Sequence, residues 1–412
     1  MKATVKLEHN LIAVEGERDV HAMLEIAPPE RADGKTRPPL SLALVVDRSG
    51  SMQGPKLAYA KRSAEWLIGR LHADDRIALV DYDDQVRLLA PIGHVDPQAL
   101  RAALNAIQPG GMTNLSGGWL KGAEQLRSDN GTRKILLLTD GLANEGITDP
   151  AALVQLATGA RGEGIGTTTI GFGDGFNEDL LTAMADAGGG NAHYAASADA
   201  APAIFAAEFD DLTRLWAQNL SLEIRPSGAV SVLGVLNEYP SVAVSGGIQV
   251  ELGDAYEGER RRVVFRLQVP ALQELGVAKV ADLVLRYVSV DDGIEQHELT
   301  IPVAVNLVSA SEAAAAAPDL EVREEVLVLA AAQARDEAIR LADEGRFDDA
   351  QAVLHDTAEK LRASGMTSLE PEANALDLEL PVMAPASYGG DPSVRKRLHY
   401  DSRRRRRGKP PS

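Results

Sequence analysis

LALVVDRSGSMQGPK, at residues 42–56, is the stretch of sequence that decides the fold. Its apolar run is typical of a strand buried on both faces, and the run ends at Asp47. Ser49 and Ser51 follow at alternate positions in a glycine-containing turn. Three oxygen-bearing side chains so close together could belong to a nucleophile, a phosphate-binding loop, a metal site or a simple turn.

The enzymatic and nucleotide-binding interpretations fail on specific residues. A serine nucleophile on a strand-to-helix turn needs G-x-S-x-G, and the flanking glycines are missing around Ser49. A phosphate-binding loop needs G-x-x-x-x-G-K-[ST], whereas Gly50, Gly54 and Lys56 are one residue short, with a proline before the lysine. The sequence GFGDGF, at 171–176, ends in phenylalanine where a dinucleotide-binding turn needs its third glycine. We therefore expect a protein that is not an enzyme.

From residue 40 to about 216 the sequence alternates between strand-like apolar runs and helix-like segments. Such alternation predicts an α/β fold, in which helices cover both faces of a parallel sheet. Two further polar positions follow predicted strands or lie in glycine-rich turns: Thr113 in PGGMTNLSGG and Asp140 in LLLTDG. Because ligand sites of such sheets lie at the carboxyl ends of the strands, we expect these residues to meet the Asp47 turn. Their oxygens suit a hard divalent cation.

The segments DRSGSM, GGMTNLSGG and LLLTDG resemble, in kind and order, the metal-ion-dependent adhesion site (MIDAS) of von Willebrand factor type A domains. The resemblance covers roughly residues 38–216. It implies a Rossmann-like, doubly wound domain that binds Mg²⁺, with Mn²⁺ or Ca²⁺ as alternatives. It also implies a protein partner that presents an Asp or Glu carboxylate to the ion. The ligands that it implies are Asp47, Ser49, Ser51, Thr113 and Asp140.

The chain outside this domain predicts two further kinds of structure. Period-two apolar patterns before residue 30 and again from 218 to about 308 are typical of strands, so we expect one antiparallel β-sandwich with the α/β domain inserted in it. A helical hairpin is expected next. That segment holds one repeat-like pair of helices, and a single pair is too short to form a peptide-binding array. The expected units are 1–37 (N-terminal strands joining the sandwich), 38–217 (α/β domain), 218–310 (β-sandwich), 311–365 (helical hairpin) and 366–412 (irregular tail).

Charge is distributed unevenly along the 412 residues. The net charge is −18, yet residues 391–412 hold nine Lys or Arg and only two Asp. An acidic body argues against general nucleic-acid binding. The basic tail fits a solvated end, a segment folded back onto the acidic body, or a tether for RNA or an anionic membrane.

Features that the sequence lacks also limit the kind of protein that we expect. The chain has no cysteine, so neither disulfides nor thiolate metal sites can form. Its N-terminus lacks a continuous apolar stretch and no run is long enough for a transmembrane segment, so a cytoplasmic protein is expected.

Two alternatives stay open beside the metal-dependent interaction module. Some domains of this kind resemble adaptors of AAA+ ATPases of the MoxR and chelatase types, so the chain could be a regulatory subunit of such a machine. It has no ATP-binding motif, and the ATPase would be a separate protein. Taken singly, Asp47 and Asp140 would also be ordinary turn or cap residues. Asp81, Asp83 and Asp84 in DYDDQ are expected to form a solvated turn with at most a supporting role.

Overall fold

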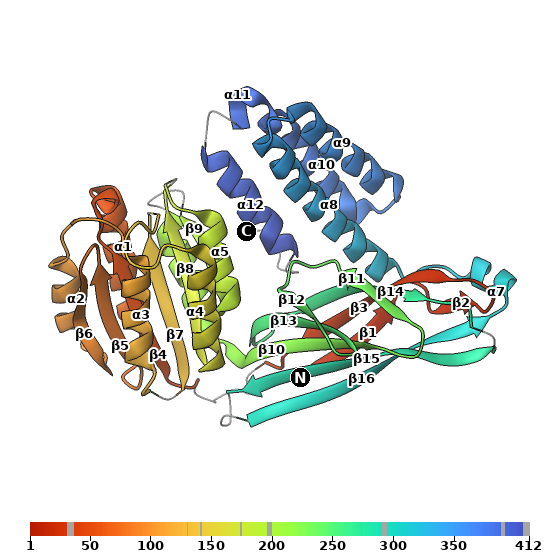
Figure 1. Cartoon of the computed structure of the whole chain (residues 1–412), viewed down its shortest axis with the longest axis horizontal. Helices are drawn as coiled ribbons and strands as arrows, with labels where there is room; N and C mark the ends of the chain where they lie inside the picture. Colours follow the sequence, from red (N-terminus) through yellow and green to blue (C-terminus); the bar gives the residue numbers. More distant parts are fainter. Residues whose placement is uncertain are drawn as a thin grey trace.

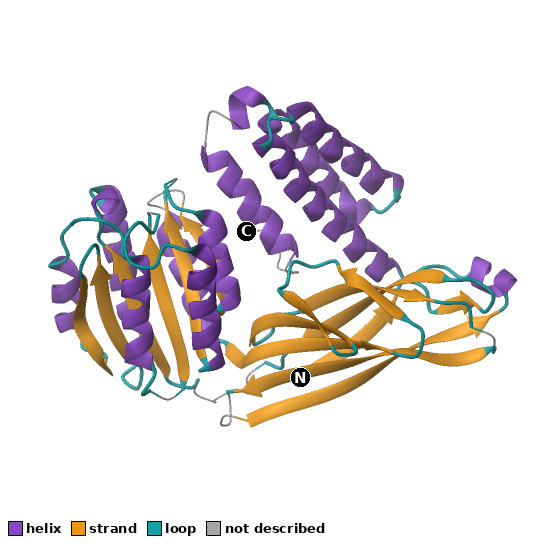
Figure 2. Cartoon of the chain, viewed as in Figure 1, coloured by secondary structure: helices purple, strands orange, loops and turns teal. Residues whose placement is uncertain are grey.

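The computed structural model describes the whole chain except residues 31–36, 130, 141, 174, 196–199, 273, 291–294, 389–391 and 407–412. Three parts are visible: an α/β domain, a β-sandwich and a group of helices (Figures 1 and 2). The α/β domain interrupts the sandwich in sequence, because strands from both sides of it pair in one sheet. The predicted fold class is confirmed. Within the described residues, no helix combines the length and apolar character needed to cross a membrane.

The central sheet of the α/β domain has the order β6-β5-β4-β7-β8-β9. Its strands are β4 (Leu40–Asp47), β5 (Arg76–Tyr82), β6 (Val86–His94), β7 (Thr132–Thr139), β8 (Ile165–Phe172) and β9 (Gly189–Ala195). All neighbours are parallel, as expected, except β5 and β6, which pair antiparallel at one edge of the sheet. Every residue of β4 is buried, as the apolar run predicts for a central strand covered on both faces.

Helices cover both faces of this sheet. They are α1 (Pro55–Ile68), α2 (Pro97–Asn105), α3 (Leu115–Leu126), α4 (Pro150–Gly162), α5 (Glu178–Ala187) and α6 (Ala200–Thr213). Buried apolar side chains of α1, α2 and α6 form one core with the sheet, and those of α3, α4 and α5 form the other. Proline in the first turn starts α1, where its missing N–H costs nothing, and the Asn114 side chain caps α3. Both helices therefore begin directly after the turns that carry the candidate site residues.

The β-sandwich consists of a four-stranded sheet, β1-β3-β14-β11, and a six-stranded sheet, β12-β13-β10-β15-β16-β2. The N-terminal strands are β1 (Lys2–Leu7), β2 (Leu11–Ala13) and β3 (Arg18–Ala27). The later strands are β10 (Leu215–Pro226), β11 (Ser231–Val235), β12 (Ser241–Val244), β13 (Gly247–Tyr256), β14 (Arg261–Val269), β15 (Gly276–Ser289) and β16 (Glu295–Val308). β3 pairs antiparallel with β14 from Arg18 to Ile26, and β2 pairs parallel with β16. Alternating side chains from both sheets fill the core between them.

The helices after the sandwich begin with α7 (Ala310–Ala315), α8 (Leu320–Asp343) and α9 (Phe347–Ala363). α8 and α9 form the predicted hairpin, with Gly345 in the left-handed conformation at the turn. Val322 and Leu329 of α8 pack on Met23 of β3 and Val264 of β14, which fixes the hairpin to the sandwich.

The predicted irregular tail after residue 365 is largely helical, and this prediction was wrong. The structure contains 3₁₀ turns at Thr367–Leu369 and Leu380–Met383 and the helices α10 (Glu370–Glu379), α11 (Pro385–Tyr388) and α12 (Pro392–Arg406). The polar sequence of α12 gives little helical apolar periodicity, so pattern alone could not identify it. Tertiary contacts stabilise it instead.

α12 contacts all three parts of the molecule and lies between the α/β domain and the other helices (Figure 1). The Lys396 Nζ donates to Glu178 Oε2 (2.6 Å) in the α/β domain. The Ser402 Oγ donates to the Ala332 carbonyl of α8 (3.0 Å), and Asn237 of the sandwich donates to the Arg406 carbonyl (3.0 Å). Arg403 forms an ion pair with Asp186. The basic end thus folds back onto the acidic body as far as it is described; the rest of the proposed tether, 407–412, lies outside the described residues.

Candidate metal centre

Asp47 and Asp140 lie at the carboxyl ends of two adjacent parallel strands. The pairing of β4 with β7 aligns Val46 with Leu138, so the next residues, Asp47 and Thr139, leave the sheet side by side. The Thr139 Oγ1 donates to Asp47 Oδ2 (2.6 Å), and Asp140 follows immediately. Both aspartates are buried, at 0% and 1% exposure. The strand register therefore places two carboxylates at one edge of the sheet.

The turn after Asp47 aims its hydroxyl groups at Asp140. The Ser49 N–H donates to Asp47 Oδ1 (2.8 Å), which tightens the turn into the 3₁₀ helix Gly50–Met52. The Ser49 and Ser51 Oγ atoms lie 3.1 Å apart, and the Ser51 Oγ donates to Asp140 Oδ1 (2.8 Å). A continuous chain of polar contacts therefore joins four of the five predicted ligands.

Thr113 reaches the same edge through main-chain contacts. The Gly50 N–H donates to the Gly111 carbonyl (2.9 Å), and the Gly110 N–H donates to the Arg48 carbonyl (2.7 Å), so the glycine-rich loop lies against the serine turn. The Thr113 N–H donates to Asn144 Oδ1 (2.7 Å), which joins it to the loop after Asp140. Thr113 is buried, at 3% exposure.

The family model of the von Willebrand factor type A domain matches residues 41–207, the segment that holds all five residues. Residues 41–207 form a von Willebrand factor type A domain. The resemblance to the type A domain is thereby confirmed for this part of the chain, while the metal site stays a prediction.

Relatives of the type A domain occur in proteins of different size. The uncharacterized protein sll0103 of Synechocystis is 28% identical over 74% of this chain and 75% of its own length. Protein YfbK of Escherichia coli is 27% identical over 56% of this chain and 42% of its own length. The inter-alpha-trypsin inhibitor heavy chain H1 of Mesocricetus auratus is 28% identical, but the match spans only 17% of that protein.

Two solved structures share the fold over most of this chain. A von Willebrand factor type A protein from Catenulispora acidiphila gives a TM-score of 0.68 at 17% identity, over 88% of this chain and 87% of that one. The ArnB paralog VWA2 from Sulfolobus acidocaldarius gives 0.66 at 18% identity, over 99% and 98% of the two chains. The type A domain, the sandwich and the C-terminal helices therefore form a fold that is found in other proteins.

The donor set of the type A domain suits a hard divalent cation. Asp47 and Asp140 offer carboxylate oxygens, and Ser49, Ser51 and Thr113 offer hydroxyl oxygens. Mg²⁺, Mn²⁺ and Ca²⁺ prefer oxygen ligands, while softer metals select thiolate or imidazole, which this site lacks. The described residues contain no cluster of three or more His, Asp or Glu that could hold a metal, so hydroxyl groups would have to complete any site here.

Asp47 has an unusual environment for a carboxyl group. Burial raises its pKa from 3.8 to about 6, although hydrogen bonds from Thr139 and Ser49 favour the charged form. The nearby charge of Asp140 adds to the increase. Among the described residues, Asp47 has no cationic side chain as an ion-pair partner. A bound cation would supply the missing positive charge.

Two acidic residues of DYDDQ support the site, and the expectation of a solvated turn was wrong for them. Asp81 and Asp83 are buried, whereas Asp84 is exposed. Asp83 accepts hydrogen bonds from Arg48 Nη2 (2.6 Å) and from the Gly111 N–H (3.0 Å). Asp83 therefore links the glycine-rich loop to Arg48, the residue that directly follows Asp47.

Gly110 permits this close packing. A Cβ atom at position 110 would lie 1.8 Å from Asp83 Oδ2, so any side chain there would push the two loops apart. Sequence reasoning identified the glycine-rich turn from its composition. The reason for the glycine is visible only in the structure.

Lys56 is a further residue beside the site whose position could not be predicted from the sequence. Its Nζ forms an ion pair with Asp140 Oδ2, opposite the oxygen that accepts from Ser51. The sequence showed Lys56 as the lysine of a failed phosphate-binding loop. The signal in the sequence that could have placed Lys56 near the site was its position in the first turn of the helix that follows the serine turn.

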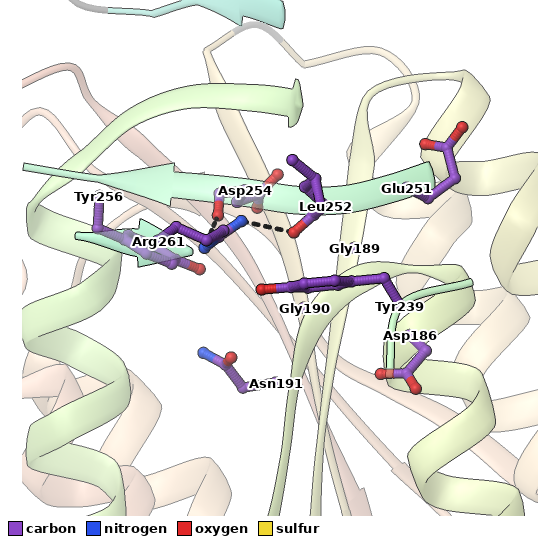
Figure 3. A pocket seen from close by; sticks show the side chains of 11 residues that line it. Asp186, Gly189, Gly190, Asn191, Tyr239, Glu251, Leu252, Asp254, Tyr256 and Arg261 are labelled. Atoms are coloured by element: carbon purple, nitrogen blue, oxygen red, sulfur yellow. Dashed lines mark hydrogen bonds between the residues drawn. The ribbon is translucent and has the colours of Figure 1, made fainter. Parts of the chain in front are cut away.

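A small hollow, separate from the candidate metal centre, lies between the type A domain and the sandwich (Figure 3). Asp186, Asn191, Tyr239, Asp254 and Arg261 are among its lining residues. Its volume is about 20 Å³, enough for about one water molecule and too small for a metabolite. The Arg261 guanidinium donates to the Asp254 carbonyl there (2.8 Å), so the polar lining is bonded within the chain.

Proposed function

We propose that the type A domain binds Mg²⁺, or Mn²⁺ or Ca²⁺ in its place, through Asp47, Ser49, Ser51, Thr113 and Asp140, and that the loaded site binds a carboxylate of a protein partner. Type A domains commonly mediate protein–protein interactions. The observation that carries the proposal is the polar chain from Ser49 through Ser51 to Asp140 beside the buried Asp47 carboxylate.

The chain's own residues prepare the site in two ways. Thr139 and the Ser49 N–H hold both oxygens of Asp47 in place, and the Arg48–Asp83 pair holds the loop of Thr113. Asp47 and Asp140 together balance a divalent charge, while neutral hydroxyls leave the ion able to attract a further anion. A bound divalent cation supplies a positive centre with a coordination position that an outside carboxylate can fill.

The surface around the site favours a particular kind of partner. Met112, Leu142 and Ile147 lie on the loops of Thr113 and Asp140 and are 48%, 53% and 40% exposed. Exposed large apolar side chains beside a binding site are typical of interaction surfaces. A partner with an Asp or Glu flanked by apolar side chains would match both the charge of the loaded site and this apolar border.

Metal-dependent stability tests the first half of the proposal. At a concentration 100 times Kd, Mg²⁺ or Mn²⁺ should add about 3 kcal/mol to the unfolding free energy of the wild type. Asp47→Ala and Thr113→Ala should lose this increase, measured by thermal unfolding in EDTA and in metal. Asp84→Asn is the control, since it removes an exposed carboxylate of a neighbouring loop. An undiminished metal response in Asp47→Ala would refute the site.

Partner capture tests the second half. Wild type and Thr113→Ala are used as bait with Mg²⁺ and again with EDTA, and the bound proteins are identified by mass spectrometry. We expect a partner that requires both Mg²⁺ and Thr113. Substituting the partner's surface Asp and Glu residues one at a time should then show one whose loss abolishes binding. A partner that binds equally in EDTA would contradict the proposed mechanism.

A further inference from the structure

Lys56 is the one cationic side chain that the described structure pairs with a carboxylate of the candidate metal centre. It lies in the first turn of α1, and its ammonium group bonds Asp140 Oδ2. Its aliphatic stem lies against Gly173, where an added Cβ atom would come within 3.0 Å of the lysine Cε. Asp140 therefore has a chain donor on each oxygen, Ser51 on Oδ1 and Lys56 on Oδ2.

The two partners of this ion pair differ in exposure. The Asp140 side chain is 0% exposed, whereas that of Lys56 is 34% exposed. A buried carboxylate that has an ion-pair partner is strongly destabilised when that partner is lost. The lysine, by contrast, has a flexible stem and access to water, so it can withdraw at little desolvation cost. Arg48, the other nearby cation, is paired with Asp81 and Asp83.

We propose that Lys56 is a built-in competitor of the divalent cation. Its ammonium neutralises Asp140 in the metal-free protein and leaves Oδ2 when the cation binds. This inference rests on the proposed metal site and adds a residue that sets its affinity. Two cations beside one carboxylate repel each other, so the lysine weakens metal binding while it stabilises the metal-free fold.

The test compares Lys56→Met with Lys56→Arg and with a lysine of the same helix. Lys61 bonds the main-chain carbonyl of Asn105 (3.2 Å), away from the site, so Lys61→Met is the matched control. Free Mn²⁺ is measured by electron paramagnetic resonance during titration of each full-length variant. Lys56→Met should bind Mn²⁺ about tenfold more tightly than the wild type, because a like charge is gone. Lys56→Arg and Lys61→Met should bind as the wild type does.

Thermal unfolding gives a second readout that does not depend on partner binding. In EDTA, Lys56→Met should melt below the wild type, since Asp140 loses its counter-charge beside Asp47. With saturating Mn²⁺ the difference should disappear or reverse. Equal or weaker Mn²⁺ affinity in Lys56→Met would overturn the competition.

A double variant separates this inference from the proposed function. Asp47→Ala combined with Lys56→Met should bind no Mn²⁺ at this site. Retained tight binding there would overturn the metal-site assignment, and so would the absence of Mn²⁺ binding in every variant. Tighter binding in Lys56→Met that is lost in the double variant supports both.

Discussion

At the scale of single residues, Asp47 shows how a candidate functional group lowers stability. Its carboxylate is buried without a cation of the described chain beside it, and its pKa is raised to about 6. The folded protein therefore holds this proton more tightly than the unfolded chain does. Ionisation costs folding free energy as the pH rises from about 4 to 6, and the full cost remains above pH 6.

We predict that Asp47→Asn stabilises the metal-free protein at pH 8. Asparagine keeps an oxygen that can accept from the Ser49 N–H, yet it carries no charge. A pKa shift of about two units corresponds to about 3 kcal/mol. Urea unfolding in EDTA at pH 8 and at pH 3.5 measures the gain, which should vanish at the lower pH, where wild-type Asp47 is protonated. A gain of equal size at both pH values would show that its cause is not ionisation.

All five proposed ligands can be recognised in the sequence, because they occupy strand ends and turns that local patterns reveal. Arg48, Lys56 and Asp83 could not be placed in the same way. Their contacts depend on how three loops, far apart in the sequence, pack against one another. What sequence patterns could not predict at this site is therefore how its loops pack against one another.

At the scale of elements, α12 is a helix made stable by its surroundings. Lys396 is buried, and its Nζ donates to Glu178 Oε2 and to the Phe176 carbonyl (2.7 Å) while it lies over the Phe176 ring. Tyr400 stacks on Tyr194 of β9. The edge strand β6 and the helices α10, α11 and α12 are among the elements that sequence patterns missed, and neither β6 nor α12 presents a clear one-sided apolar face.

We predict that Lys396→Met loosens α12 and destabilises the protein by about 2–4 kcal/mol, because it removes one partner of a buried ion pair. Trypsin should cleave the arginine-rich segment after 396 faster than in the wild type, measured by mass spectrometry over time. Lys360→Met, at an exposed position of α9, is the control and should change neither value. Unchanged cleavage in Lys396→Met would mean that other contacts hold the helix.

At the scale of the whole molecule, a buried ion pair joins the type A domain to the sandwich. The Lys134 Nζ of β7 donates to Asp254 Oδ2 of β13 (2.8 Å). Burial opposes the charge of Lys134, but the carboxylates of Asp254 and Glu208 outweigh it and hold the lysine's pKa above 10.5. Arg161 adds a second link to Glu251 (2.8 Å). The two parts are therefore expected to unfold together.

We predict that Lys134→Met separates their unfolding. Loss of one partner leaves Asp254 buried without its counter-charge and should cost about 3–5 kcal/mol, whereas Lys134→Met combined with Asp254→Asn should recover much of this loss. Differential scanning calorimetry should show one transition in the wild type and two in the single variant. Lys121→Met, on the outer side of α3, is the control. A single variant as cooperative as the wild type would contradict the prediction.

The pairing of β3 with β14 also has a consequence for the newly made chain. The first strands leave the ribosome well before the strand that completes their sheet, and the whole type A domain is synthesised in between. That domain contains its own two cores and can fold as it emerges, while the edge of β3 stays unpaired until β14 has been synthesised. The nascent protein therefore passes through a stage in which the hairpin of β1 and β3 is exposed to misassociation, and α12 can join the three parts only after all of them have been synthesised.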